Sequence, residues 1–229
     1  NENEVTRLSN DVFTMDKILL GDVFIRGGSS SGTHVLEEGR PIGQFYGLVC
    51  NGIDENGRYI LVDKDGDGEI SDPADYDYIG SAQPKLTYGI TNSFRYKNFD
   101  LSFFLRGTIG NDILNATRMA YAQSGFLPGT NALDDPLTYT LSETPRFSNY
   151  YLEKGSFMRL DNLTLGYKIK ALNGIRVYFT AQNLFVITKY KGLDPEVPMD
   201  SGDGLTPGVE PREFYPKART FSVGLNLNF

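Results

Sequence analysis

Stretches of about ten residues in this sequence alternate between bulky apolar residues and small or polar ones, a pattern that fits extended strands. The closing stretch, TFSVGLNLNF, places Phe221, Val223, Leu225, Leu227 and Phe229 on one face of such a strand. Serine, glycine and asparagine occupy the opposite face. A helix would scatter these residues around its axis, so the pattern indicates β-strands. The two faces of each strand must lie in different surroundings. Those surroundings are either protein core and water, or lipid and a water-filled lumen.

The same alternation recurs in two predicted hairpins. Together with the closing strand, these hairpins give strands over residues 86–96, 99–107, 162–170, 175–185 and 219–229. Lys97–Asn98 forms the turn of the first hairpin. Asn173–Gly174 forms the turn of the second, since this dipeptide favours positive φ.

Two earlier segments are also predicted to be strands, although their alternation is poor. They are ILLGDVFIRG at residues 18–27 and GQFYGLVCNG at residues 43–52. With them the prediction rises to about seven strands. No segment has a sustained helical period, and a short helix is expected only within residues 111–123.

The connections between the predicted strands are alternately long and short. The long ones cover residues 54–84, 108–156 and 188–218. Structureless loops of this length are uncommon in compact soluble domains. Outer-membrane barrels, by contrast, combine short periplasmic turns with long extracellular loops. The pattern favours a transmembrane antiparallel β-barrel and leaves a soluble β-sandwich open.

Composition excludes several other classes. The formal net charge is −7, and no basic run is present, so a nucleic-acid partner is not expected. Cys50 is the single cysteine, and His34 is the single histidine and lies in a Gly/Ser-rich run, so we expect no disulfide and no enzyme. No stretch approaches the roughly 20 apolar residues of a membrane helix, which excludes helical spans only. The chain begins NENEV without Met, and we expect it to be a mature or truncated piece of a longer protein.

The acidic stretch DKDGDGEISDPAD, residues 63–75, resembles a calcium-binding loop. The acids stand at alternate positions, a glycine follows at the sharp turn, and hard cations prefer such sets of oxygen ligands. The predicted ligands are Asp63, Asp65, Asp67, Glu69 through its carbonyl, and Asp72 or Asp75. Ala74 takes the place of the usual bidentate acid at the twelfth position. We therefore expect a structural Ca²⁺ of weak affinity, against the alternative of a solvated acidic loop.

Tyrosines are frequent in the predicted loops. They are Tyr76, Tyr78, Tyr121, Tyr139, Tyr150 and Tyr151. Such side chains suit stacking on sugar rings or contact with a partner protein, and they equally suit packing of the loops against one another.

Several segments taken together resemble the SusC-like TonB-dependent outer-membrane transporters. They are GRPIGQFYGLVCNGI (39–53), the acidic loop, IGSAQPKLTYGITNSFRYKNFDLSFFLRGTIGNDI (79–113), GSFMRLDNLTLGY (155–167), AQNLFVITKYKGLDPEV (181–197) and YPKARTFSVGLNLNF (215–229). They keep the order and spacing of that family across nearly the whole chain.

The resemblance implies that residues 1–229 are the C-terminal portion of a barrel domain in the bacterial outer membrane. They would supply about the last seven of roughly 22 strands, around a plug that lies outside this sequence. Phe229 is similar to the terminal aromatic that the barrel assembly machinery reads. The implied function is nutrient uptake, in which oligosaccharides or peptides are imported with a SusD-like surface lipoprotein and energy from TonB. The implied partners are the rest of the barrel and plug, this lipoprotein, TonB, the cargo and the lipid bilayer.

Two other functions are compatible with parts of the pattern. A secreted, calcium-stabilised β-sandwich that binds glycans would share the acidic loop and the tyrosines. A hydrolase would need a carboxylate pair, and none stands in a recognisable context.

Overall fold

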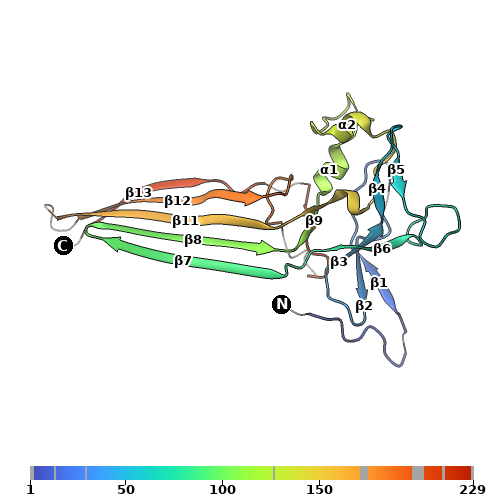
Figure 1. Ribbon diagram of the computed structural model, residues 1–229, viewed down its shortest axis with the longest axis horizontal. Helices are drawn as coiled ribbons and strands as arrows, with labels where there is room; N and C mark the ends of the chain where they lie inside the picture. The colour runs from blue at the N-terminus through green and yellow to red at the C-terminus, as the bar shows by residue number, and fades with distance from the viewer. Residues whose placement is uncertain are drawn as a thin grey trace.

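The computed structural model describes residues 3–12, 14–28, 30–125, 127–170, 175–197, 204–212 and 215–227. The predicted turn at Asn173–Gly174 and the terminal Phe229 lie outside these residues. Figure 1 shows an elongated molecule with a long sheet at one end and shorter strands and helices at the other.

The long sheet, here called the wall sheet, consists of five antiparallel strands. They are β7 (Leu86–Tyr96), β8 (Phe99–Ile109), β11 (Phe157–Ile169), β12 (Ile175–Thr188) and β13 (Thr220–Asn226). Their order in the sheet is β13-β12-β11-β8-β7. Both predicted hairpins and the closing strand are thereby confirmed, and so is the all-β fold class.

The long connections all gather at one end of the wall sheet (Figure 1). The β7–β8 turn and the end of β13 lie at the opposite end. This is the asymmetry that the alternately long and short connections predicted.

The remaining elements form what we call the outer lobe. A four-stranded sheet of order β1-β2-β3-β6 contains β1 (Lys17–Leu20), β2 (His34–Glu37), β3 (Gln44–Leu48) and β6 (Tyr76–Ser81). Two smaller pairs are β4 (Cys50–Ile53) with β5 (Tyr59–Leu61), and β9 (Asp112–Leu114) with β10 (Leu152–Lys154). The helices are α1 (Ala116–Tyr121), α2 (Pro136–Thr140) and the 3-10 turn η1 (Asn149–Tyr151).

The two poorly alternating segments lie in this lobe and not in the wall sheet. Residues 18–27 contribute to β1, and residues 43–52 contribute to β3 and β4. Phe45 and Leu48 are fully buried, so these strands pack into a protein core, where strict alternation is not required. The wall sheet therefore contains five of the seven predicted strands. The expected short helix within 111–123 is α1.

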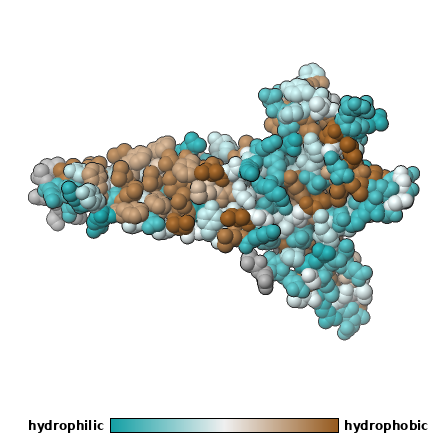
Figure 2. All heavy atoms as spheres, viewed as in Figure 1, coloured by the Kyte–Doolittle hydropathy of each residue, from teal (hydrophilic) through white to brown (hydrophobic). Residues whose placement is uncertain are grey.

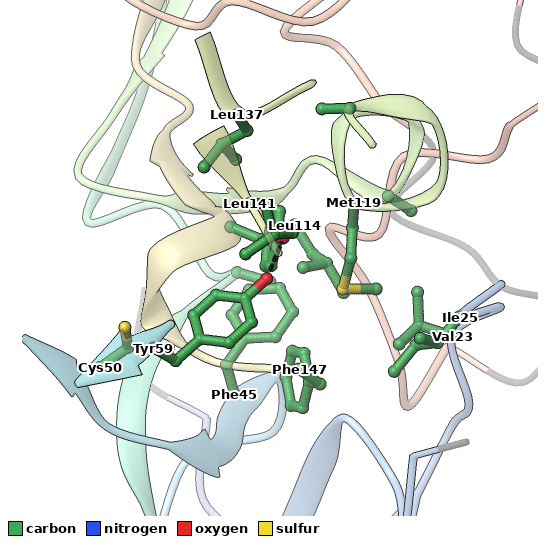
Figure 3. Packing of buried hydrophobic residues seen from close by; sticks show 14 residues of the cluster. Val23, Ile25, Phe45, Cys50, Tyr59, Leu114, Met119, Leu137, Leu141 and Phe147 are labelled. Carbon is green, nitrogen blue, oxygen red and sulfur yellow. Dashed lines mark hydrogen bonds between the residues drawn. The ribbon is translucent and has the colours of Figure 1, made fainter. Parts of the chain in front are cut away.

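The outer lobe has its own hydrophobic core. Figure 3 shows Phe45 and Phe147 packed with Leu114, Leu141 and Met119. These residues come from β3, β9, α1 and the segment before η1, so the long connections fold into one body. Among the described residues, the helices are too short to cross a membrane.

Substitutions on the two faces of β13 should have different effects in the full-length protein. Val223 is 76% exposed on the apolar face of the wall sheet. If this face meets lipid, Val223→Arg should destabilise the folded protein in lipid vesicles by about 2–4 kcal/mol, measured by urea unfolding. Ser222→Arg on the opposite face is the matched control and should have little effect. Equal losses for the two variants would contradict a lipid-facing surface.

Candidate functional site

The wall sheet has one apolar and one polar face because residues directly opposite one another on paired strands lie on the same side, and the register shifts only on β11, between Leu160 and Asn162. Its apolar face exposes large side chains, and Figure 2 shows this hydrophobic surface along the sheet. They include Ile90, Phe94, Phe99, Leu165, Phe179, Phe221, Val223 and Leu225. An exposed apolar surface of this extent marks contact with a membrane or a partner.

The polar face carries short hydroxyl side chains in a single row. Ser93, Ser102, Thr164, Thr180 and Ser222 stand directly opposite one another across the five strands. The hydroxyl oxygens of Thr164 and Thr180 are 3.1 Å apart. Each hydroxyl both donates and accepts hydrogen bonds, so the row presents a neutral, readily hydrated surface.

Nearer the β7–β8 turn, larger side chains on the polar face lie flat against the sheet. Arg176 donates to both carboxylate oxygens of Asp100, at 2.9 and 2.5 Å. Its guanidinium lies over Gly166, and the ring of Tyr178 lies over Gly224. A Cβ atom at either glycine would collide with these groups. Because these glycines have no side chain, Arg176 and Tyr178 can lie close against the backbone of the sheet.

At the end of the wall sheet nearest the outer lobe, the polar face carries a cluster of charges. Arg159 on β11 is 1% exposed and donates to Asp194 at 2.5 Å and to the Asn183 side chain. Asn183 has a φ of 51° beside an irregularity in the β11–β12 register, and its amide also donates to the carbonyl of Lys217. The residues after β12 are thereby held against the sheet.

A second part of the same cluster surrounds Glu196. Arg106 donates to both carboxylate oxygens of Glu196, at 2.6 and 2.9 Å, and to Asp161 at 3.2 Å. Lys217 donates to Glu196 at 2.5 Å. Burial tends to raise the pKa of Glu196, but the hydrogen bonds from Arg106 and Lys217 outweigh it and hold the pKa below its ordinary value. The sequence pattern placed Arg106 on the polar face, but it did not reveal Arg159, Asp194 or Glu196.

The acidic loop brings together three of the six predicted calcium ligands. One carboxylate oxygen from each of Asp63, Asp65 and Asp67 lies within 4.8 Å of the others. Backbone N–H groups within the loop donate to these carboxylates; for example, those of Gly66 and Gly68 donate to Asp63. The geometry is that of a turn with converging oxygen atoms.

The carboxylates of Asp72 and Asp75 are not part of this group, and the predicted contribution of the Glu69 carbonyl stays a prediction. Glu69 is exposed, and its backbone N–H donates to Asp67. Asp72 accepts a hydrogen bond from Arg146 at 2.7 Å.

Asp75 is buried and accepts from the backbone N–H groups of Ser71, Lys64 and Asp65. The donors on Ser71 and Lys64 hold the pKa of Asp75 below its ordinary value. Because the pKa of Asp75 is lowered in the folded state, ionised Asp75 stabilises the folded protein. This contribution is complete above about pH 4 and is lost at more acidic pH. The prediction of a calcium site remains a prediction.

The loop tyrosines differ in burial, and Tyr78, Tyr121 and Tyr150 are half-buried. Tyr76 and Tyr151 are almost completely buried in the outer lobe, and burial raises the pKa of each to about 12. The hydroxyl oxygens of Tyr151 and Tyr59 are 2.5 Å apart. Tyr139, in contrast, is exposed on α2. Packing of the loops therefore accounts for the buried tyrosines.

The single histidine and the single cysteine are both buried. His34 Nε2 is 2.9 Å from the carbonyl oxygen of Pro207, and its ring packs against Phe45. Burial raises the pKa of the Cys50 thiol. Both side chains thus take part in packing within the outer lobe.

Comparison with curated proteins and with solved structures gave consistent matches, whereas no family model matches. The chain is 35% identical to "TonB-dependent receptor SusC" of Bacteroides thetaiotaomicron over 248 residues, which cover 100% of this chain and 23% of that protein. It is 34% identical to "TonB-dependent receptor P3" of Formosa agariphila over 237 residues, covering 86% of this chain and 23% of the relative. The chain thus spans about a quarter of the length of these curated relatives.

Solved structures give the same picture. The structure of the RagAB peptide transporter matches with a TM-score of 0.71 and 25% identity, over 97% of this chain and 25% of the matched chain. The RagAB peptide importer in its closed-closed state matches equally well.

Loss of Asp194 should destabilise the full-length protein. Asp194→Ala removes the carboxylate that Arg159 contacts at 2.5 Å and leaves this buried guanidinium only Glu196, 3.6 Å from its Nε atom, at a cost of about 3 kcal/mol in urea unfolding in detergent. Asp161→Ala is the matched control: Arg106 is partly exposed and keeps Glu196, so the expected loss is below about 1 kcal/mol. If the two variants lose similar stability, burial of Arg159 does not determine the strength of this cluster.

Proposed function

Because the chain belongs to the SusC-like TonB-dependent receptors of the bacterial outer membrane, we propose that it forms part of the wall and outer surface of a nutrient importer. The observation that carries this proposal is the two-faced wall sheet, with exposed apolar residues on one side and polar residues, among them the row of hydroxyl groups and the Arg176–Asp100 pair, on the other. Lipid covers the first face, and the second lines the lumen. The outer lobe lies at the extracellular end.

We propose that the complete transporter imports oligosaccharides or peptides and has no catalytic activity. The matched RagAB structures are described as a peptide transporter, which supports cargo of this size. A SusD-like lipoprotein covers the outer lobe and retains cargo above the lumen. TonB drives uptake through a part of the transporter that this chain does not contain.

Uptake experiments test this proposal. Labelled oligosaccharides and short peptides are supplied to cells with and without the gene for the full-length transporter. We expect uptake of at least one cargo to fall to background when either that gene or the TonB gene is deleted, and to return on complementation. Unchanged uptake of every cargo would contradict the proposal.

The solubility of the purified full-length protein separates the proposal from the alternative of a secreted glycan-binding module. A barrel requires detergent or lipid because its apolar face would otherwise associate in water. A secreted module stays monomeric in water without detergent. Glycan turnover by the purified protein would instead indicate a hydrolase.

We further propose that the loop at residues 63–75 holds a structural Ca²⁺. The support is the convergence of Asp63, Asp65 and Asp67 in a sequence whose spacing follows calcium-binding loops. Asp72 and Asp75 contribute indirectly, since their contacts with Arg146 and with backbone N–H groups close the loop. The ion would be held by few protein ligands and several waters.

Calcium titration of the full-length protein should show one weak site. We expect heat of binding with a Kd on the order of 10⁻⁴ to 10⁻³ M, because extracellular sites with few ligands fall in this range. Asp65→Ala should abolish the heat, whereas Glu55→Ala, at a nearby exposed acid, should retain it. Absence of heat at millimolar calcium would show that the loop is only solvated.

A further inference from the structure

A polar residue, Asn92, lies on the apolar face of the wall sheet. It stands on β7 directly opposite Phe103 of β8. The same row continues across the sheet through Leu163 on β11, Ala181 on β12 and Phe221 on β13. The other members of this row are all apolar, so Asn92 departs from the pattern of the face on which it lies.

The described neighbours of Asn92 on this face offer no hydrogen-bonding side chain. Those along β7 and across β8 are Ile90, Phe94, Leu101, Phe103 and Leu105. The rings of Phe94 and Phe103 stack on each other with their centroids 6.2 Å apart. The amide of Asn92 can donate two hydrogen bonds and accept two. On the side of β8, therefore, its surroundings match it poorly.

Position 92 lies well inside β7, which runs from Leu86 to Tyr96. A strand of about 9–11 residues spans the hydrocarbon of a membrane, so this position lies far from both membrane surfaces. Asn92 is exposed on the described chain, and in a membrane lipid would replace the water around it. An amide without a hydrogen-bonding partner is strongly unfavourable in such surroundings.

The outer edge of β7 is the direction from which a partner can reach Asn92. Among the described strands, β7 pairs with β8 alone. In a membrane a further strand must pair with its other edge, because free backbone groups are too unfavourable there. The residue of that strand directly opposite Asn92 shares the same face, with Cβ atoms about 4.5–5.5 Å apart. A polar side chain at that position can therefore bond to the Asn92 amide.

We propose that Asn92 forms a hydrogen bond with an amide or hydroxyl side chain on the strand that pairs with the outer edge of β7. This proposal rests on the proposed function, because only a membrane keeps water away from Asn92. The bond selects one register for the two strands. A shift by one residue turns the partner side chain to the opposite face, and a shift by two moves it away from Asn92.

Opposite substitutions at two positions of the same row test the proposal in the full-length protein. Asn92→Leu and Leu163→Asn exchange two side chains of similar shape at the same level of the sheet. We expect Asn92→Leu to raise the equilibrium constant for urea unfolding in lipid vesicles about tenfold, because the partner is left without its bond. Leu163→Asn, the matched control, should also raise this constant, because Phe103 and Ala181 stand on either side of it and offer no hydrogen bond.

A second pair of variants gives the same information if Asn92→Leu does not fold. Threonine and valine have similar shapes and both favour strands, but only threonine has a hydroxyl. Asn92→Thr should therefore unfold with a constant about fivefold smaller than that of Asn92→Val. At Leu163 the order should be reversed, since a hydroxyl there has only apolar neighbours.

The directions of these changes decide the result. If Asn92→Leu stabilises the protein while Leu163→Asn destabilises it, Asn92 has no partner; the proposal is then overturned, and the lipid-covered face is retained. If Leu163→Asn has no effect, water reaches this face, and the proposed function fails together with the inference. Measurements at two protein-to-lipid ratios identify the partner. A loss in Asn92→Leu that disappears when the protein is diluted in lipid would assign the partner to a second copy and would overturn the proposal.

Discussion

In hydrocarbon, no water can hydrogen-bond a free backbone N–H or C=O group, and the wall sheet depends on this constraint. Each of its inner strands pairs with a neighbour on both sides. The two outer strands, β7 and β13, pair on one side within the described residues. In a membrane their free edges must meet further strands, because unsatisfied backbone groups are too costly there. Further strands of a longer protein would provide such partners, in agreement with a chain that spans about a quarter of the length of its curated relatives.

The same constraint explains which parts of the fold could be predicted from the sequence. A strand between lipid and water alternates between apolar and polar residues; residues 220–226 do so throughout, and residues 86–96 do so except at Asn92. The strands of the outer lobe are surrounded by protein, so β3 and β4 lack this signal. The sequence could predict that β3 and β4 are strands, but it could not predict that they lie in the outer lobe and not in the wall sheet. The charge cluster depends on contacts between distant residues such as Arg159 and Asp194, and a local pattern carries no information about such contacts.

The acidic loop illustrates the same division between local and distant contacts. Spacing alone brings Asp63, Asp65 and Asp67 together, because alternate residues of a tight turn point inward. The positions of Asp72 and Asp75 depend on Arg146, far along the chain, and on backbone N–H groups that become available only in the folded loop. Counting positions from the first aspartate could not predict these contacts.

The core of the outer lobe combines Val23 and Ile25 from the start of the chain with Tyr151 and, at its edge, Val209. These residues are separated by strands β7, β8, β11 and β12, which lie in the wall sheet. Contacts of such long sequence separation form slowly, since the intervening chain must first lose entropy. The lobe therefore cannot complete its core until the chain through Val209, with β7, β8, β11 and β12, is available. Closure of this core should be a late step in folding, and a protease-resistant lobe would be a sign that the strands between its parts are in place.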